Sequence, residues 1–364
     1  MKIKIIRSKF IESLKPLQNI VANKGSLQIL QNVMIEALDG KIKMTTTDLD
    51  ISIISICECD VIDSGSTTLP VKLLFNAIGK VAEGEIIIDV DSNDYCVISA
   101  GNAKFKLVGM PSSEFPKLPY DENSYIYTLP QVVFKEMLKK VSYAASIEDT
   151  RRTLKGVLVS LKDSKITMVA TDGRRLALVE NEIEFPKNNE RDLVLPSKTV
   201  QELQRSLNSS GDISLMIQKS QICFKVENMM IYSKLIEDVY PNYRQVIPTE
   251  CIEKIKIDRQ LLLDALDRAS VMTVDEAHSI KLIFSNGKLI VTSAVSDIGE
   301  ARDEVPIKYA GEKIEIMFNP SYVMDPLKVI DDDEVLVHIN DGHSPVMIKC
   351  SIPFIYVLMP LRIS

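Results

Sequence analysis

The sequence has few of the residues and motifs on which enzyme active sites depend. Its 364 residues include only three histidines, His278, His338 and His343. His338 lies in an alternating, strand-like run that favours a structural role, and His278 lies in a polar loop. There is no glycine-rich phosphate loop, no GxSxG and no HExxH motif. These absences argue against a hydrolase or a transferase and predict a protein that is not an enzyme and has no cofactor.

Cysteine is also sparse and scattered. Of the six cysteines, only Cys57 and Cys59 are close together. Alternation along a strand would point both thiols to one face, but no second cysteine pair or nearby histidine completes a zinc site. We therefore predict buried free thiols and no metal.

Long apolar runs are missing as well. No segment approaches the length of a membrane span, and the first residues, MKIKIIRSKF, lack the apolar core of a signal peptide. The 46% apolar and 26% charged content is typical of a soluble globular protein, which we expect to be cytoplasmic. Because the net charge is −7, any nucleic-acid contact has to come from a local basic face.

What the sequence does contain is a threefold repeat. The order helix, strands, helix, strands occurs three times, and the hairpin turns at Asp39, Asp163 and Asn286 lie 124 and 123 residues apart. This spacing predicts an α+β protein of three similar domains, 1–124, 125–249 and 250–364, each with two helices and about eight strands. If these domains curve through half a circle, two chains placed head to tail close a ring.

The helices of the repeats are read from apolar spacing and capping residues. They are predicted at 8–21, 71–80, 131–145, 197–207, 259–271 and 320–330. Pro16 is expected to kink the first helix and Pro326 to interrupt the last, while Ser197 and Asp258 are expected to act as N-caps.

The predicted helices are net basic within an acidic chain. Lysines on any single helix are most simply explained by solvation, so the inference depends on the whole set. If the helices line one surface, that surface attracts phosphates without reading bases. The basic residues are Lys9, Lys15, Lys72, Lys80, Lys135, Lys139, Lys140, Lys198, Arg205, Arg259, Arg268 and Lys328.

A second prominent feature is the stretch VATDGRRLAL, residues 169–178. Asp172 and Gly173 favour a tight turn, which would present Arg174 and Arg175 at a bend. A charged turn with no binding role is the simpler interpretation, but Asp48 occupies the equivalent place in the first repeat. Equivalent aspartates in two repeats indicate a turn requirement and not an acid/base pair.

Seven segments then carry a resemblance to a known family, in matching order and spacing. They are KPLQ (15–18), TTTDLD (45–50), EFPKLP (114–119), VATDGRRLA (169–177), SKLIEDVYPNYRQVIP (233–248), FNPSYVMD (318–325) and MPLR (359–362). Over its whole length the chain resembles the bacterial DNA polymerase III beta subunits, the sliding clamps. The resemblance implies a head-to-tail homodimeric ring of six similar domains around double-stranded DNA, with helices lining the inside and sheets outside.

The resemblance also implies functional residues. A pocket between the second and third domains would dock short peptides of the DNA polymerase III alpha subunit, the clamp loader, repair polymerases and mismatch-repair proteins, in an apolar groove rimmed by two arginines. Its residues would be Leu154, Thr171, Gly173, Arg174, Arg175, Leu176, Pro241, Val246, His343, Pro345, Val357, Leu358, Met359, Pro360, Leu361 and Arg362. DNA contacts would come from Lys24, Lys72, Arg152 and Lys198, and the dimer contact from Phe105 and Leu107 against Val271 and Met272.

The sequence departs from the family pattern at a few positions. Arg174 stands where many clamps have histidine, and Gln28 replaces a frequent proline. An alternative function is a three-domain protein-interaction scaffold that does not encircle DNA. Such a scaffold would keep the peptide pocket and lose the basic lining.

Overall fold

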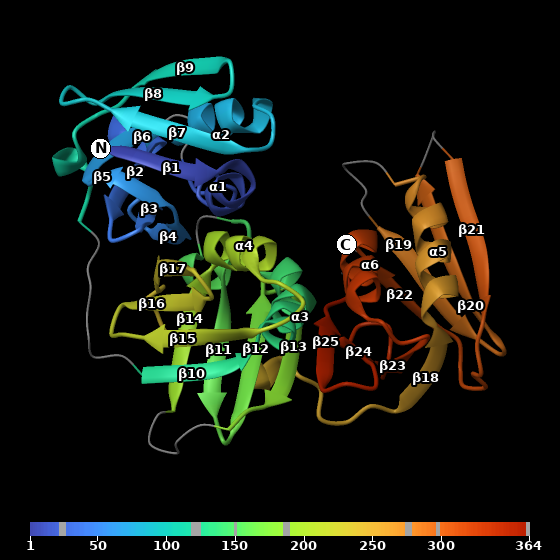
Figure 1. Ribbon diagram of the computed structural model, residues 1–364. Helices are drawn as coiled ribbons and strands as arrows, with labels where there is room; N and C mark the ends of the chain where they lie inside the picture. Colours follow the sequence, from blue (N-terminus) through green and yellow to red (C-terminus); the bar gives the residue numbers. More distant parts are fainter. Residues whose placement is uncertain are drawn as a thin grey trace. The chain divides into compact units, whose positions relative to one another are not determined.

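The structure is a computed structural model that describes residues 1–21, 27–117, 125–148, 151–184, 190–273, 279–295 and 299–361 (Figure 1). Within these residues it contains six α-helices and 25 strands, in three successive repeats of the predicted order. The predicted α+β architecture of three similar domains is confirmed. Among the described residues, no helix has both the length and the apolar character needed to cross a membrane.

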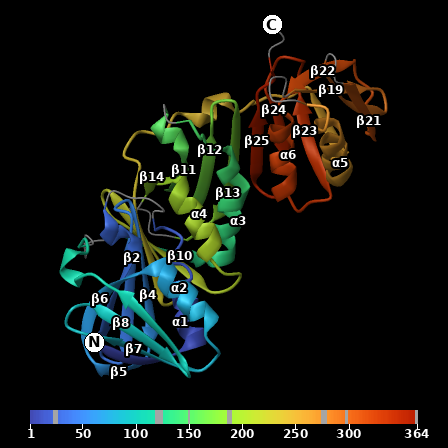
Figure 2. The ribbon, with the colours of Figure 1, turned by 90° about the horizontal axis from the view of Figure 1, so that it is seen from above.

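Each repeat holds two helices. They are α1 (Arg7–Leu14), α2 (Val71–Lys80), α3 (Gln131–Val141), α4 (Ser197–Ser206), α5 (Arg259–Ser270) and α6 (Pro320–Val329). Within each end repeat the two helices pack on each other, α1 on α2 and α5 on α6 (Figure 2).

The strands follow the same repeating order. The first repeat has β1 (Lys2–Ile6), β2 (Asn32–Leu38), β3 (Lys41–Thr47), β4 (Ile51–Glu58), β5 (Asp60–Asp63), β6 (Gly65–Pro70), β7 (Glu85–Val90), β8 (Tyr95–Ala100) and β9 (Ala103–Val108). The second has β10 (Tyr125–Pro130), β11 (Gly156–Lys162), β12 (Lys165–Thr171), β13 (Arg175–Glu182), β14 (Arg191–Pro196), β15 (Asp212–Ile217), β16 (Gln221–Val226) and β17 (Met229–Lys234). The third has β18 (Glu253–Asp258), β19 (Ile280–Ser285), β20 (Lys288–Val295), β21 (Gly299–Pro306), β22 (Ile314–Phe318), β23 (Glu334–Ile339), β24 (Val346–Lys349) and β25 (Phe354–Leu358).

The three predicted hairpin turns are confirmed. Each joins two antiparallel strands through two residues, as between β2 and β3. Asp39 and Gly40 have φ of 52° and 74°, and Asp163 and Ser164 have φ of 52° and 56°. Positive φ at both central residues is the geometry that matches the twist of paired strands, which explains why Asp and Gly recur there.

Two predictions about proline were wrong. The first helix ends at Leu14 instead of bending at Pro16. The N–H of Lys15 still bonds the carbonyl of Ile11, but Pro16 has no N–H with which to continue the helical bonding. The last helix, in contrast, runs through Pro326 to Val329. Pro326 cannot bond the carbonyl of Tyr322, and that carbonyl accepts instead from the hydroxyl of Tyr356.

The predictions for other helix ends are confirmed only in part. Asp258 caps α5 as predicted, since its carboxylate accepts from the N–H of Leu261 at 2.8 Å. Ser197, predicted as an N-cap, is the first helical residue of α4, and its hydroxyl donates to the carbonyl of Lys155. The third helix is shorter than predicted, because it changes to a 3₁₀ turn at 142–144.

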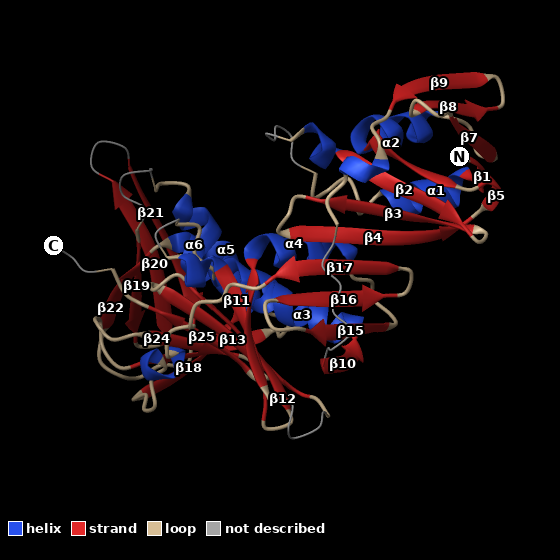
Figure 3. Cartoon of the chain, turned by 90° about the vertical axis from the view of Figure 1, so that its left-hand side faces the viewer, coloured by secondary structure: helices blue, strands red, loops and turns tan. Residues whose placement is uncertain are grey.

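The strands form four antiparallel sheets, two of which join neighbouring repeats. One eight-stranded sheet has the order β10-β15-β16-β17-β4-β3-β2-β6 and joins the first and second repeats where β17 pairs with β4 (Figure 3). The other has the order β14-β11-β12-β13-β25-β24-β23-β18 and joins the second and third repeats where β13 pairs with β25.

This sharing explains how the chain divides. By contacts it forms two compact units, 1–134 with 201–235, and 135–200 with 236–364. The division passes through the second repeat, because each half of that repeat completes its sheet with a neighbour. The two remaining sheets have the orders β5-β1-β7-β8-β9 and β21-β20-β19-β22, so β9 and β21 are edge strands.

Candidate partner groove and DNA-contact residues

The bend between β12 and β13 is built by the side chains that the sequence singled out. The carboxylate of Asp172 accepts from the N–H groups of Arg174 and Arg175 at 2.8 and 3.0 Å. Gly173 has φ of 89°, a conformation that disfavours any residue with a Cβ. In the first repeat Asp48 bonds two following N–H groups in the same way. The repeated aspartate is therefore a turn requirement, as predicted.

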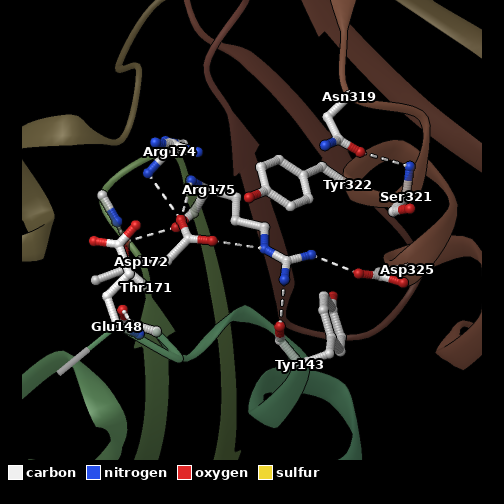
Figure 4. A network of polar contacts seen from close by, with 12 residues as sticks. Tyr143, Glu148, Thr171, Asp172, Arg174, Arg175, Asn319, Ser321, Tyr322 and Asp325 are labelled. Atoms are coloured by element: carbon white, nitrogen blue, oxygen red, sulfur yellow. Dashed lines mark hydrogen bonds and ion pairs between the residues drawn. The ribbon is translucent and has the colours of Figure 1, made fainter. Parts of the chain in front are cut away.

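The two arginines leave this bend in different directions (Figure 4). Arg175 donates to Asp172 at 3.1 Å, to Asp325 at 2.5 Å and to the carbonyl of Tyr143 at 2.6 Å. Its guanidinium carbon lies 4.1 Å from the ring centre of Tyr322, and only 10% of the side chain is exposed. Arg175 therefore ties β13 to the end of α3 and to α6.

The buried position of Arg175 does not neutralise it. Burial alone opposes the charged form, but the electrostatic effects of Tyr356, Asp325 and Asp172 outweigh burial and raise the pKa of Arg175 above its usual value. The guanidinium stays charged and fully engaged. Of the two arginines only Arg174 is exposed at the bend, so the expected rim formed by both is wrong.

A groove next to the bend brings several predicted residues together. It has a volume of about 580 Å³ and includes the predicted residues Leu154 and Pro241. The full lining is Arg151, Arg152, Thr153, Leu154, Asp238, Val239 and Pro241. An ideal Cβ on Gly173 would lie 2.7 Å from Nη1 of Arg151, so Gly173 also makes room for that guanidinium. Arg151 was missed from the sequence, where the pair Arg151-Arg152 just before Leu154 was the available signal.

The apolar residues predicted for the pocket divide into a buried floor and an exposed rim. Leu176 and Val357 are buried in one cluster, against which Tyr240 and Ile247 pack. Leu358 is also buried, at 1% exposure, so these three support the surface and do not line it. Val246, Met359 and Leu361 are exposed, at 50%, 43% and 39%, and Pro241 is exposed as well.

The last described residues are fixed beside the bend by their backbones. The N–H of Met359 donates to the carbonyl of Arg174 at 2.9 Å, and the N–H of Leu361 donates to Met317 at 2.8 Å. Pro345 directly precedes Val346, which pairs with Leu358. This pairing places Pro345 beside the segment that begins at Met359. His343 is exposed in the same loop, where its N–H donates to Asp341. The predicted Arg362 lies outside the described residues.

Of the residues predicted to contact DNA, two line one pocket. Arg152 and Lys198 border a volume of about 560 Å³ at the start of α4, together with Lys155, Glu237 and Asp238. Arg152 thus lines both this pocket and the groove. Lys72 is exposed on α2, and the predicted Lys24 lies outside the described residues.

The predicted dimer residues lie at the two sheet edges. Phe105 and Leu107 are half-buried on β9, where they alternate with the exposed Lys104 and Lys106. Val271, 74% exposed, follows α5. The sulfur of the next residue, Met272, lies 3.6 Å from where a Cβ on Gly299 of β21 would be.

Three family models, each described as a domain of the DNA polymerase III beta subunit, cover almost the entire chain. The N-terminal domain matches residues 1–119, the central domain 128–242 and the C-terminal domain 244–362. The chain belongs to the DNA polymerase III beta-subunit family. The resemblance read from the seven sequence segments is confirmed.

Relatives within the beta-subunit family match over the full length. The beta sliding clamp of Chlamydia muridarum is 31% identical to this chain, and the alignment covers 100% of this chain and 99% of the relative. The beta sliding clamp of Proteus mirabilis is 29% identical, with 100% of both chains covered. Beta-subunit sliding clamps are non-catalytic processivity factors, which confirms the prediction that this chain is not an enzyme.

Solved beta subunits have the same fold. The crystal structure of the Pseudomonas aeruginosa subunit has a TM-score of 0.96 at 26% identity, and 100% of each chain is covered. A Bartonella birtlesii sliding clamp, solved bound to griselimycin, has a TM-score of 0.96 at 30% identity, again with 100% of each chain covered.

Proposed function

We propose that two copies of this chain form a head-to-tail ring that encircles double-stranded DNA and slides on it without reading its sequence. In the cytoplasm the ring tethers the DNA polymerase III alpha subunit, the clamp loader, repair polymerases and mismatch-repair proteins to DNA through short peptides. The observation that carries the proposal is a repeated pattern of strand pairing. Equivalent strands of neighbouring repeats pair at two junctions within the chain, and the third equivalent set of strands lies at two sheet edges.

The pattern follows from equivalent strands in the three repeats. β9, β17 and β25 are the last strands of their repeats, and β4, β13 and β21 follow the first hairpin of theirs. Within the chain, β17 pairs with β4 and β25 pairs with β13. The strands left over are β9 and β21, which are both sheet edges. Pairing β9 of one chain with β21 of a second chain would repeat the same junction and close a ring.

The two internal junctions also have the same register. Ser52 pairs with Tyr232 in one, and the equivalent residues Leu176 and Val357 pair in the other. Carried onto β9 and β21, this register sets Lys106 opposite Glu300 and Phe105 opposite Ala301. A lysine opposite a glutamate is a favourable cross-strand pair, which supports the assignment.

The proposed DNA contacts are backbone contacts by Lys72, Arg152 and Lys198, together with Lys24. Lys72 and Lys198 hold the second position of α2 and α4, the second helices of the first two repeats. Lysines at matching places on repeated helices suit a regularly charged partner such as the phosphate backbone.

Topological trapping separates this proposal from a scaffold that does not encircle DNA. The chain, placed on nicked circular DNA by a clamp loader, should be retained during gel filtration and should be released once the circle is cut. Retention that is independent of DNA ends would overturn the proposal. The double variant Lys72→Glu with Lys198→Glu should shorten retention on DNA. It should also make the slope of log binding constant against log salt concentration less steep, by about 0.9 for each phosphate that the variant no longer neutralises. Lys41→Glu with Lys225→Glu, two exposed strand lysines, is the matched control.

The proposed peptide pocket combines the groove, the bend and the terminal segment. Its polar members include Thr171, Gly173 and Arg174. Its apolar members include Leu154, Pro241, Val246, Met359 and Leu361. The proposed pocket also includes His343, Pro360 and Arg362. Exposed apolar side chains gathered beside exposed guanidinium groups suit a short peptide with apolar anchors.

A further inference from the structure

We infer that the first repeat of this chain turns against the second, while the second and third repeats are held rigidly together. The first junction is the pairing of β17 with β4, and the second junction is the pairing of β25 with β13. The two junctions share one strand register but differ in the side chains beside the strands. The role of this bending rests on the proposed function, because a ring has to change shape when it opens to admit DNA.

The second junction is reinforced by Arg175, which connects the end of α3 to α6 (Figure 4). Its guanidinium pairs with the carboxylate of Asp325, and its guanidinium carbon lies 4.1 Å from the ring centre of Tyr322. The ring of Tyr143, just after α3, lies 6.0 Å from the ring of Tyr356 in β25. These contacts join side chains of the second repeat to side chains of the third, so rotation at this junction would separate a charged pair that is mostly buried.

At the first junction an apolar residue takes the place of Arg175. Asp48 and Asp172 each accept from the N–H group three residues later, which belongs to Ile51 in one case and to Arg175 in the other. The two positions are therefore equivalent, in agreement with the strand register. Ile51 is 1% exposed and has no charge, so its side chain cannot form the ion pair that Arg175 forms.

The partners of Arg175 are replaced as well. Counted from the start of each helix, Asn19 holds the place of Tyr143, and Glu202 holds the place of Asp325. The amide of Asn19 donates to the carboxylate of Glu202 at 3.2 Å. An amide has no net charge, so this contact lacks the Coulomb attraction that Arg175 supplies at the second junction.

An open groove lies beside the first junction. It has a volume of about 860 Å³ and extends between the ends of α1 and α4 and the turn that joins β16 to β17. Among the described residues, exposed charged side chains line it without forming an ion pair, namely Lys9, Glu12, Lys15, Glu58 and Glu227. Such a space can narrow or widen without separating paired charges. The strand pair then serves as the axis about which the first repeat turns.

The difference between the junctions separates two tasks within the proposed ring. Turning of the first repeat moves β9, the strand proposed to close the ring, while the proposed peptide pocket at the second junction keeps its shape. A bound partner peptide therefore does not have to leave when the ring opens.

The test measures distances between two spin labels placed across each junction by double electron–electron resonance. Labelled chains are diluted with unlabelled chains, so that only label pairs within one chain are measured. The distance distribution across the first junction should be at least about twice as broad as that across the second. The label pairs are Glu12→Cys with Arg205→Cys for the first junction, Glu136→Cys with Lys328→Cys at the equivalent positions of the second, and Glu12→Cys with Lys80→Cys as a control within the first repeat, all in a chain with Cys59→Ser, Cys251→Ser and Cys350→Ser.

Variants at the junctions connect the spread of distances to its cause. Arg175→Met should broaden the distribution across the second junction to that of the first. Tyr322→Leu removes only the stacked ring and should broaden it less, and this variant decides the question if Arg175→Met does not fold. In the opposite direction, Ile51→Arg with Asn19→Tyr places a guanidinium and a ring beside Glu202 and should narrow the distribution across the first junction.

Two results would overturn the inference. One is equal breadth across both junctions in the unchanged protein, and the other is an unchanged distribution across the second junction in the Tyr322→Leu variant. Neither result bears on ring closure, which retention on circular DNA tests independently. Release from circular DNA that does not depend on its ends, combined with unequal breadths, would overturn the ring and support the flexible first junction.

Discussion

The hydroxyl of Tyr356 donates to the carbonyl oxygen of Tyr322 across 2.7 Å. Tyr322 lies four residues before Pro326 in α6, so its carbonyl has no N–H to accept from within the helix. Tyr356 is fully buried in β25, and burial raises its pKa far above the usual tyrosine value, which keeps the hydroxyl protonated as a donor. Each residue thus satisfies a polar group that the other would leave unpaired.

Replacing Tyr356 with phenylalanine should therefore destabilise the protein. The variant leaves the half-buried Tyr322 carbonyl without its partner, at a cost of about 1–2 kcal/mol in the free energy of unfolding. Pro326→Ala restores an N–H that can bond this carbonyl, so Tyr356→Phe should cost less in that background. Urea unfolding of the two single variants and the double variant measures the coupling, and simple additivity would contradict this account.

The second prediction concerns adjacent arginines with different roles. Arg175→Ala removes a guanidinium bonded to Asp172, Asp325 and Tyr143, and leaves two carboxylates without their partner. Loss of one member of such a buried pair costs about 3–5 kcal/mol. Arg174→Ala, at the exposed neighbour, should change stability little. Denaturant midpoints of both variants provide the check, and equal stability of the two would show that Arg175 has no structural role.

Local features of the fold were readable from the sequence, while contacts between distant segments were not. Asp39, Asp163 and Asn286 mark turns because their conformational requirement is local. The end of α1 is local in principle too, since Pro16 lacks an N–H, but the apolar spacing beyond it suggested a longer helix. Whether Pro326 interrupts α6 depended on Tyr356, which lies 30 residues away.

In the candidate site, too, local features could be predicted from the sequence and contacts between distant segments could not. The bend at Asp172 and Gly173 was predicted because its bonds run between near neighbours. The direction of the Arg175 side chain was not, because Asp325 is 150 residues further along the chain. Arg151 was missed for a related reason, since its place beside Gly173 depends on how two separate loops pack.

A third prediction concerns pH and His338, which pairs in register with Lys254 on β18. The residue is 6% exposed, and burial together with Lys349 and Lys254 lowers its pKa below the usual value of 6.5. Between the folded and unfolded pKa values the unfolded chain binds more protons, so stability rises with pH. The contribution is complete above about pH 6.5 and is lost as the pH falls toward the folded pKa.

Unfolding free energies measured from about pH 7 down to about pH 5 should therefore decline, and His338→Gln should reduce this decline. An equal slope in the His338 variant would exclude this residue as the titrating group.

The last prediction tests the strand register at the proposed junction between two chains. If β9 of one chain pairs with β21 of the other as β17 pairs with β4, Lys106 faces Glu300 and Phe105 faces Ala301. Directly opposite residues in antiparallel strands have Cα atoms about 4.5–5.5 Å apart, within the range of a disulfide. The double variants Lys106→Cys with Glu300→Cys, and Phe105→Cys with Ala301→Cys, should therefore cross-link under mild oxidation.

Each variant chain contributes one cysteine to each of two junctions, so oxidation should yield a covalently closed dimer on a non-reducing gel. Opposite residues in antiparallel strands alternate between hydrogen-bonded pairs and non-hydrogen-bonded pairs, and the side chains are closer in the second kind. Testing two adjacent pairs includes one of each kind, so at least one pair should react quickly. Lys106→Cys with Arg302→Cys shifts the pairing by two residues and is the matched control, and the unchanged protein controls for its six native cysteines. Faster cross-linking of the shifted pair than of both direct pairs would mean that the rule joining repeats within the chain does not govern the contact between chains.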